Sequence, residues 1–142
     1  LVEPGGIELD GVKLDLRKIK VPCYIVSTRE DHIAPWKSTF AATQLYKGPI
    51  RFVLSASGHI AGIVNPPAAN KYCYWTNDKT PADPIQWLDG AVQHEGSWWT
   101  DWNAWAMTHA GKQLVKARVP GVGKLKALCD APGTYVAVKA EE

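Results

Sequence analysis

The chain has 142 residues, 46% of them apolar and 21% charged, which is ordinary for one soluble globular domain or for part of a larger one. A formal charge of +2, with scattered basic residues, gives no argument for a nucleic-acid or anionic-membrane partner. No apolar run approaches the roughly 20 residues of a membrane span, and residues 1–10 do not resemble a secretory signal.

The first half of the chain alternates strands and loops with one helix. In chain order, the sequence predicts a hairpin around Asp10-Gly11 (7–9 and 12–14), a short helical turn (15–20), a buried strand VPCYIVST (21–28), a polar loop REDHIAP (29–35), a helix (36–46) and a second strand IRFVLS (50–55). This alternation is typical of a parallel sheet, and the predicted fold class is therefore α/β.

The second half predicts helices and a surface tail. We expect a short helix at 84–93, a longer one at 97–113, and a tail from 115 to 142 that ends in a strand-like YVAV. Trp98, Trp102, Trp105 and His109 would share one face of the longer helix. Two strands cannot make a parallel sheet covered on both faces, so we expect the remaining strands upstream of residue 1. Because the sequence also begins without Met, we expect a fragment.

Asp31 and His59 are the candidate catalytic residues. Each follows a predicted parallel strand, and the carboxyl edge of such a sheet is where ligands and catalytic groups gather. An acid followed by a histidine is also the chain order of the hydrolase triad after its nucleophile. The carboxylate would fix the imidazole tautomer so that the other nitrogen can accept a proton. Alternatively, Asp31 caps a helix and His59 is an ordinary loop residue.

The remaining reactive residues form no evident site. His32, beside Asp31, contacts substrate, tunes the acid or simply faces solvent, and His109 is expected to pack among the tryptophans. Cys23, Cys73 and Cys129 lack zinc-site or disulfide spacing, so we expect no metal and a reducing, cytoplasmic location. None of them, and no serine, lies in the G-x-[SC]-x-G elbow that presents a hydrolase nucleophile.

Three segments resemble class I polyhydroxyalkanoate synthases, which polymerise (R)-3-hydroxyacyl-CoA into polyester. They are REDHIAPW (29–36), GPIRFVLSASGHIAGIVNPP (48–67) and GSWWTDWNAW (96–105), and the resemblance extends over essentially all 142 residues. It implies that residues 1–142 are the C-terminal part of an α/β-hydrolase-type catalytic domain, whose nucleophilic cysteine and N-terminal domain lie upstream.

The resemblance also implies roles for individual residues. Asp31 would be the triad acid, His59 the general base and His32 a substrate-binding residue. No cofactor is expected, since coenzyme A is part of the substrate and a product. The implied partners are the growing polyester chain, a second subunit in a homodimer, and the surface of a cytoplasmic polyester granule. Two alternatives remain: a non-catalytic module that binds a granule or a subunit through its tryptophans, and an esterase or depolymerase on the same scaffold.

Overall fold

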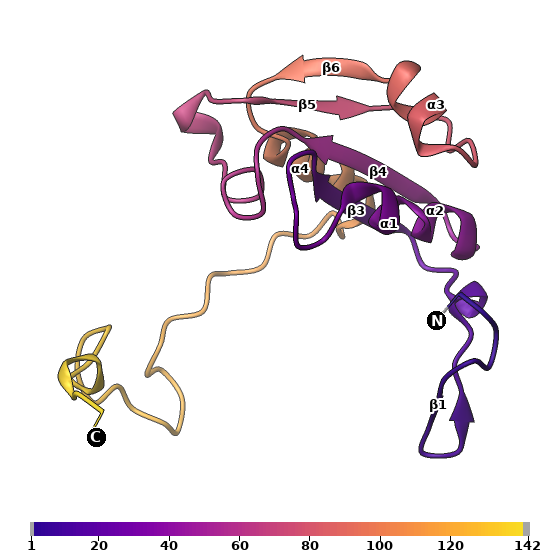
Figure 1. The fold of residues 1–142 in the computed structure, drawn as a ribbon. Coiled ribbons are helices and arrows are strands. Elements are labelled where there is room, and N and C mark those ends of the chain that lie inside the picture. Colours follow the sequence, from indigo (N-terminus) through magenta and orange to yellow (C-terminus); the bar gives the residue numbers. More distant parts are fainter. Residues whose placement is uncertain (1, 141–142) are drawn as a thin grey trace. The chain divides into compact units, whose positions relative to one another are not determined.

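The computed structural model describes residues 2–140, which divide into two compact units (Figure 1). The first unit ends at Ala110 and the second begins at Gly111. All of the sheet and the four α-helices belong to the first unit. No helix in the described residues is long and apolar enough to cross a membrane.

A four-stranded sheet organises the first unit. Its strands, in spatial order, are β3 (Cys23–Thr28), β4 (Ile50–Ser55), β5 (Cys73–Thr76) and β6 (Val92–Glu95). β3 and β4 are parallel, as the sequence predicted, whereas β5 and β6 each run antiparallel to their neighbour. Two strands that the sequence did not predict, β5 and β6, thus extend the sheet from downstream of β4. The expectation of further strands upstream of residue 1 stays a prediction. The mixed α/β class itself is confirmed.

Helices cover both faces of this sheet (Figure 1). The short helices α1 (Trp36–Phe40), α2 (Ala42–Leu45) and α3 (Pro84–Asp89) pack on one side, and α4 (Trp99–His109) lies on the other. The predicted helix over 36–46 is interrupted at Ala41. There the backbone N–H bonds the Ser38 carbonyl three residues back at 3.3 Å, which replaces an α-helical turn with a tighter one.

Aromatic side chains build the core on the α1–α3 face. The buried cluster consists of Trp36, Phe40, Phe52, Leu54 and Trp87. Phe52 meets Phe40 and Trp87 edge to face, with ring centroids 5.0 Å apart in both pairs. This geometry places positive ring edges against negative ring faces and adds to the burial of apolar area.

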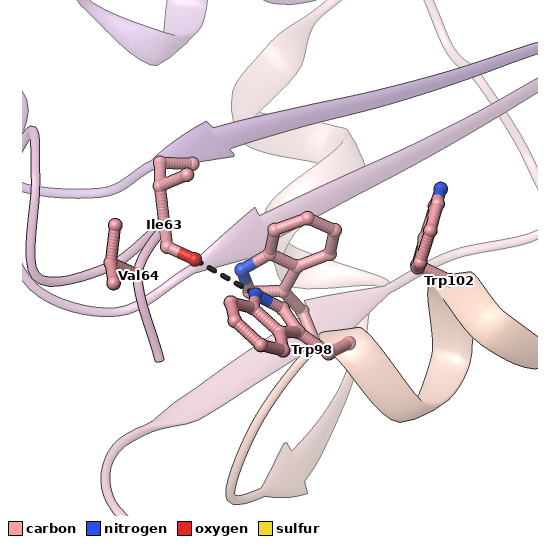
Figure 2. A pocket seen from close by; sticks show the side chains of 5 residues that line it. Ile63, Val64, Trp98 and Trp102 are labelled. Carbon is pink, nitrogen blue, oxygen red and sulfur yellow. Dashed lines mark hydrogen bonds between the residues drawn. The ribbon is translucent and has the colours of Figure 1, made fainter. Parts of the chain in front are cut away.

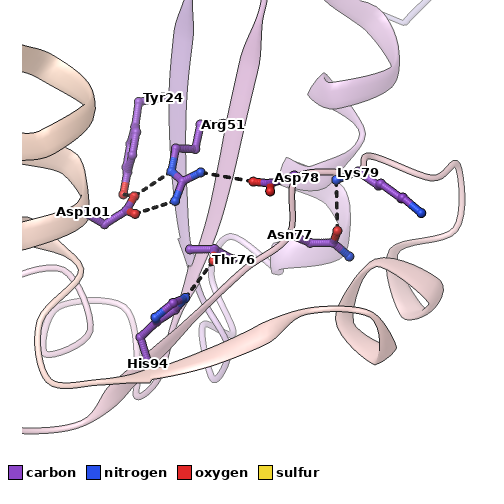
Figure 3. Close-up of polar contacts among 8 residues, drawn as sticks. All are labelled: Tyr24, Arg51, Thr76, Asn77, Asp78, Lys79, His94 and Asp101. Atoms are coloured by element: carbon purple, nitrogen blue, oxygen red, sulfur yellow. Dashed lines mark hydrogen bonds and ion pairs between the residues drawn. The ribbon is translucent and has the colours of Figure 1, made fainter. Parts of the chain in front are cut away.

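A polar network joins α4 to the opposite face (Figure 3). The Asp101 carboxylate on α4 accepts hydrogen bonds from Tyr24 Oη (2.9 Å) and Arg51 Nε (2.7 Å), and forms a second, parallel contact with Arg51 Nη2. Burial opposes ionisation of Asp101, but the hydrogen bonds from Arg51 and Tyr24 outweigh it, so the pKa of Asp101 lies below its usual value. Burial, with the Asp101 hydrogen bond, raises the pKa of Tyr24 far above its usual value.

The predicted hairpin is present near the N-terminus. β1 (Glu8–Leu9) pairs antiparallel with β2 (Val12–Lys13), and the turn residues Asp10 and Gly11 have φ values of 48° and 73°. Two positive φ angles are what a type I′ hairpin turn requires. The predicted helical turn over 15–20 forms the 3-10 helix η1 (Leu16–Lys18), and a second one, η2 (Pro67–Ala69), follows β4.

Two helix boundaries and one element type need correction. The predicted helix at 84–93 ends at Asp89, and its last two residues lie in β6. The helix at 97–113 is shorter, because α4 ends at His109. In the second unit, YVAV forms the 3-10 helix η3 (Tyr135–Ala137) instead of a strand, since its N–H groups bond local carbonyls instead of a neighbouring strand.

Candidate functional site

Asp31 and His59 meet at the carboxyl edge of the parallel strand pair. Thr28 and Ser55, the last residues of β3 and β4, are paired in register, so both strands end at the same level. The loops that follow stay connected, because Arg29 N donates to Ser55 O (2.8 Å) and Glu30 N to Ser57 O (3.1 Å). Parallel pairing therefore brings together two side chains that are 28 residues apart in sequence.

The imidazole and the carboxylate form a direct hydrogen bond. His59 Nδ1 lies 2.8 Å from Asp31 Oδ2. The Asp31 side chain is only 8% exposed, whereas that of His59 is 47% exposed. The acid is thus enclosed while the histidine reaches outward. With Nδ1 occupied by the carboxylate, Nε2 is the ring nitrogen left for a reacting group.

Backbone donors hold the Asp31 carboxylate in place. Asp31 Oδ1 accepts hydrogen bonds from the amides of Ile33 and Ala34, each at 2.9 Å. The pKa of Asp31 is lowered to about 2. The hydrogen bond from the Ala34 amide has the largest effect, and the hydrogen bond with His59 has the next largest. The group is therefore a carboxylate at neutral pH, and its own local turn presents Oδ2 to the histidine.

The loop that carries His59 is tightly folded. Ser57 has a φ of 73°, in the left-handed region, where the chain turns out of β4. Further along, Gly62 N donates to Gly58 O at 3.0 Å and Val64 N to Ile60 O at 2.8 Å. Gly62 is buried, and a Cβ at that position would overlap the Thr28 methyl group and the Ala56 carbonyl. Only glycine therefore fits where the loop crosses the end of β3.

Two tryptophans reach this loop from the start of α4 (Figure 2). Trp98 Nε1 donates to Gly62 O at 3.0 Å, and Trp99 Nε1 donates to Ile63 O at 2.9 Å. An apolar hollow of about 290 Å³ lies beside these bonds. It is lined by Ile63, Val64, Trp98, Trp99 and Trp102. Helical spacing did not predict this link, because it leaves Trp99 off the face that Trp98 shares with Trp102. The adjacent pair Trp98-Trp99 was the one sequence feature that pointed to it.

The other sequence-predicted candidates lie apart from this pair or are poorly suited to it. His32 follows Asp31 directly and is exposed. Cys23 begins β3, five residues and roughly 16 Å from the strand end that leads to Asp31. Cys73 lies near the edge, but burial raises the pKa of its thiol, which disfavours the reactive thiolate. Cys129 is exposed in the second unit.

Within residues 2–140 no cluster of three or more His, Cys, Asp or Glu side chains has the arrangement of a metal site. His109, expected to pack among the tryptophans, is exposed overall, although its ring lies 4.4 Å from that of Trp105. His94 instead contacts Thr76 Oγ1 at 2.8 Å (Figure 3).

The chain is similar over nearly its whole length to part of known polymerases. It is 50% identical over 137 residues to the poly(3-hydroxyalkanoate) polymerase subunit PhaC of Cupriavidus necator, covering 96% of this chain and 23% of that protein. The subunit of the same name from Rhizobium etli is 47% identical over 128 residues, 90% of this chain and 20% of that protein. The poly(3-hydroxyalkanoate) polymerase of Methylorubrum extorquens is 44% identical over 137 residues, 96% of this chain and 22% of that protein.

These matches confirm the resemblance inferred from the three sequence motifs. No family model matches the chain. The chain spans less than a quarter of the length of the curated relatives described above.

Proposed function

We propose that this chain supplies the acid and the base of a poly(3-hydroxyalkanoate) polymerase that transfers (R)-3-hydroxyacyl groups from coenzyme A to a growing polyester. His59 is the general base and Asp31 the group that orients it. The observation that carries the proposal is the 2.8 Å bond between His59 Nδ1 and Asp31 Oδ2 at the carboxyl edge of β3 and β4. The names of the relatives supply the polymer, poly(3-hydroxyalkanoate), and the coenzyme A thioester comes from the sequence resemblance.

In the first half-reaction, His59 Nε2 accepts the proton of a cysteine thiol that another segment of the polymerase contributes. The thiolate attacks the thioester carbonyl carbon, the bond from that carbon to the coenzyme A sulfur breaks, and the departing thiolate takes the proton from the imidazolium. An acyl-cysteine and free coenzyme A result. Coenzyme A is thus part of the substrate and a product, and the step requires no cofactor. Cysteine suits this role because its thioester stays reactive toward an alcohol.

In the second half-reaction, His59 accepts the proton of a 3-hydroxyl group, and the resulting alkoxide attacks the acyl-cysteine. The carbon–sulfur bond breaks, an ester forms, and the cysteine thiolate recovers the proton. Asp31 holds the imidazole in both halves. Its low pKa of about 2 makes it a poor proton acceptor, which favours the orienting role over direct deprotonation of the hydroxyl.

The proposal extends to the surroundings of the pair. His32, exposed beside Asp31, is a substrate contact, and the chain forms the C-terminal part of an α/β-hydrolase-type catalytic domain. A homodimer at the surface of a cytoplasmic polyester granule follows from the same resemblance. The polymerase names of the relatives argue against the esterase alternative.

The alternative of a tryptophan-based contact module has less support. Trp98 and Trp99 donate their indole N–H groups to the His59 loop, and the Trp105 ring lies 5.4 Å from that of Tyr24. Trp102 is 46% exposed and is the member of the group most open to solvent. Three of the four tryptophans are therefore engaged inside the first unit.

A segment exchange tests the proposed function. The matching segment of the C. necator polymerase is replaced by this chain, and coenzyme A release from (R)-3-hydroxybutyryl-CoA is measured with a thiol reagent. The chimera is expected to be active, and Asp31→Ala or His59→Ala should each lower kcat by about 10³-fold or more, as for other triads. His109→Ala, a histidine outside the loop, is the control and should leave the rate unchanged. A His59→Ala chimera of full activity would refute the proposal.

A further inference from the structure

The proposed base, His59, lies on an exposed part of the loop from Gly58 to Val64. His59 lies two residues after Ser57, which has a positive φ, and the His59 side chain is 47% exposed, so packing around the imidazole does little to hold it. Asp31 fixes one end of the ring through Nδ1. The direction of Nε2 also depends on where the loop backbone lies, and that position has to be set by contacts further along the loop.

Those contacts converge on two consecutive carbonyl groups. Gly62 O accepts hydrogen bonds from both Ser55 Oγ (2.8 Å) and Trp98 Nε1 (3.0 Å). Ile63 O accepts one from Trp99 Nε1 at 2.9 Å. Ser55 is fully buried at the end of β4, so the loop is tied on one side to the sheet and on the other to the start of α4.

The tie to α4 is itself anchored on the sheet. Asp101, two residues after Trp99, bonds Tyr24 on β3 and Arg51 on β4 (Figure 3). The Trp98 ring also stacks on that of Tyr24 at a centroid distance of 6.1 Å and an interplanar angle of 28°. The first turn of α4 is therefore held against the strands that carry the candidate pair.

We propose that Trp98 and Trp99 are positioning residues that act on His59 through the carbonyl groups of Gly62 and Ile63. This inference rests on the proposed function, in which His59 is the base. The two indole donors fix the backbone of the loop at Gly62 and Ile63, and Asp31 fixes the imidazole. Together they set both the place and the tautomer of the ring. Neither tryptophan has to touch substrate for this role.

The arrangement explains why both residues are tryptophan. Phenylalanine could fill the same apolar space but has no N–H group to donate, and histidine or glutamine would not fill it. Tryptophan combines a large apolar ring with a single donor. This combination suits residues that line an apolar hollow and also bond the carbonyl groups of Gly62 and Ile63. The expected consequence is that losing the donor alone changes the rate.

The experiment removes each donor in the chimeric polymerase that carries this chain. Trp98→Phe and Trp99→Phe are each expected to lower kcat roughly tenfold with KM changed by less than about twofold, because a small misplacement of a catalytic group acts on the chemical step. Trp102→Phe is the control. It removes an indole from the same helix, and within residues 2–140 that indole N–H has no hydrogen-bond partner. This substitution should leave both kcat and KM unchanged.

A spectroscopic measurement separates positioning from general loss of stability. With ¹⁵N-labelled histidine, the His59 Nδ1–H proton shared with Asp31 should shift or broaden in Trp98→Phe and Trp99→Phe but not in Trp102→Phe. If a phenylalanine variant fails to fold, benzothienylalanine keeps the shape of the indole and removes only the donor.

The results distinguish failure of this inference from failure of the proposed function. Unchanged proton signals and unchanged kcat in both tryptophan variants overturn this inference even if His59→Ala is inactive. Full activity of His59→Ala overturns the proposed function instead, whereas an altered Nδ1–H signal in the tryptophan variants would still establish that the indoles position the ring.

Discussion

The two faces of the sheet are built on different principles. On one face, Phe52 and Leu54 of β4 are completely buried under the aromatic rings of α1 and α3. On the other face, Arg51 of the same strand and Tyr24 of β3 meet a carboxylate on α4. The first face depends on the amount of apolar area removed from water, and the second on the direction of a few hydrogen bonds.

The difference shows how one small sheet is stabilised on one face and holds α4 in a defined orientation on the other. Apolar packing is non-directional, so the aromatic face can stabilise the unit without fixing how α4 is oriented. A bidentate arginine–carboxylate contact has a defined geometry, and it lies one turn from the tryptophans that hold the His59 loop. The candidate site is thus linked to the polar face.

The largest expected effect comes from the aromatic face. Trp87 is completely buried and contacts Trp36, Phe40 and Phe52. Trp87→Ala should lower the free energy of unfolding by about 3–5 kcal/mol, because it removes a large apolar side chain and leaves a cavity. Denaturant unfolding monitored by circular dichroism would measure the change.

Trp102→Ala is the matched control on the polar side. Its ring is 46% exposed, so the same substitution should cost well under half as much as at Trp87. Equal losses at the two positions would contradict the assignment of the core to the α1–α3 face.

An intermediate effect is expected when the polar network loses its cation. Arg51→Met keeps most of the aliphatic stem but leaves Asp101, whose side chain is 16% exposed, without its charged partner. The free energy of unfolding should fall by about 1–3 kcal/mol, the usual cost of removing one hydrogen-bond partner from an enclosed charged group, and Tyr24 would remain as the other partner of Asp101. The double variant Arg51→Met/Asp101→Leu should recover part of this loss, because an apolar pair removes the unpaired charge. Additive losses would show that the two residues are not coupled.

The elements that the sequence predicted best are those defined by local signals. β4 has the predicted bounds because an apolar run is closed by Pro49 before it and by the Ser57-Gly58 turn after it. The hairpin turn at Asp10-Gly11 is equally local, since the two residues themselves tolerate positive φ. In each case the residues that decide the structure lie within a few positions of the element.

The elements that were missed depend on distant partners. β6 reads VQHE, with no alternation of buried apolar residues, and becomes a strand through its pairing with β5. β5 has only four residues and is placed by its antiparallel register with β4. Neither pairing leaves a local trace in the sequence, which is why β5 and β6 were not predicted.

The candidate site shows the same division. The proximity of Asp31 and His59 was predictable, because both follow neighbouring parallel strands. Their catalytic role remains a prediction. The roles of Trp98 and Trp99 were not predictable, because helical spacing groups Trp98 with Trp102 and Trp105 and says nothing about where an indole N–H points. That direction is settled by packing across the sheet.

The smallest expected effect is a pH dependence of stability, which should arise on the polar face of the sheet and not on the aromatic face. The pKa of Asp101 is lowered in the folded state by Arg51 and Tyr24 against the opposing effect of burial, and that of Asp31 is lowered to about 2. In the unfolded chain both carboxyls titrate near their ordinary value of about 4. Between these pKa values the unfolded state binds more protons, so stability should be full above about pH 5 and should decline as the pH falls toward 2.

One substitution on each face tests which residues cause the loss of stability at low pH. Asp101→Asn should flatten the decline of the urea midpoint between pH 5 and pH 2.5, because the variant no longer carries a carboxyl whose pKa differs between the two states. On the aromatic face, Phe52→Leu should lower the midpoint by a similar amount at every pH, since no ionisable group is changed. A parallel shift for Asp101→Asn would show that its network contributes no proton linkage and that the two faces differ only in packing.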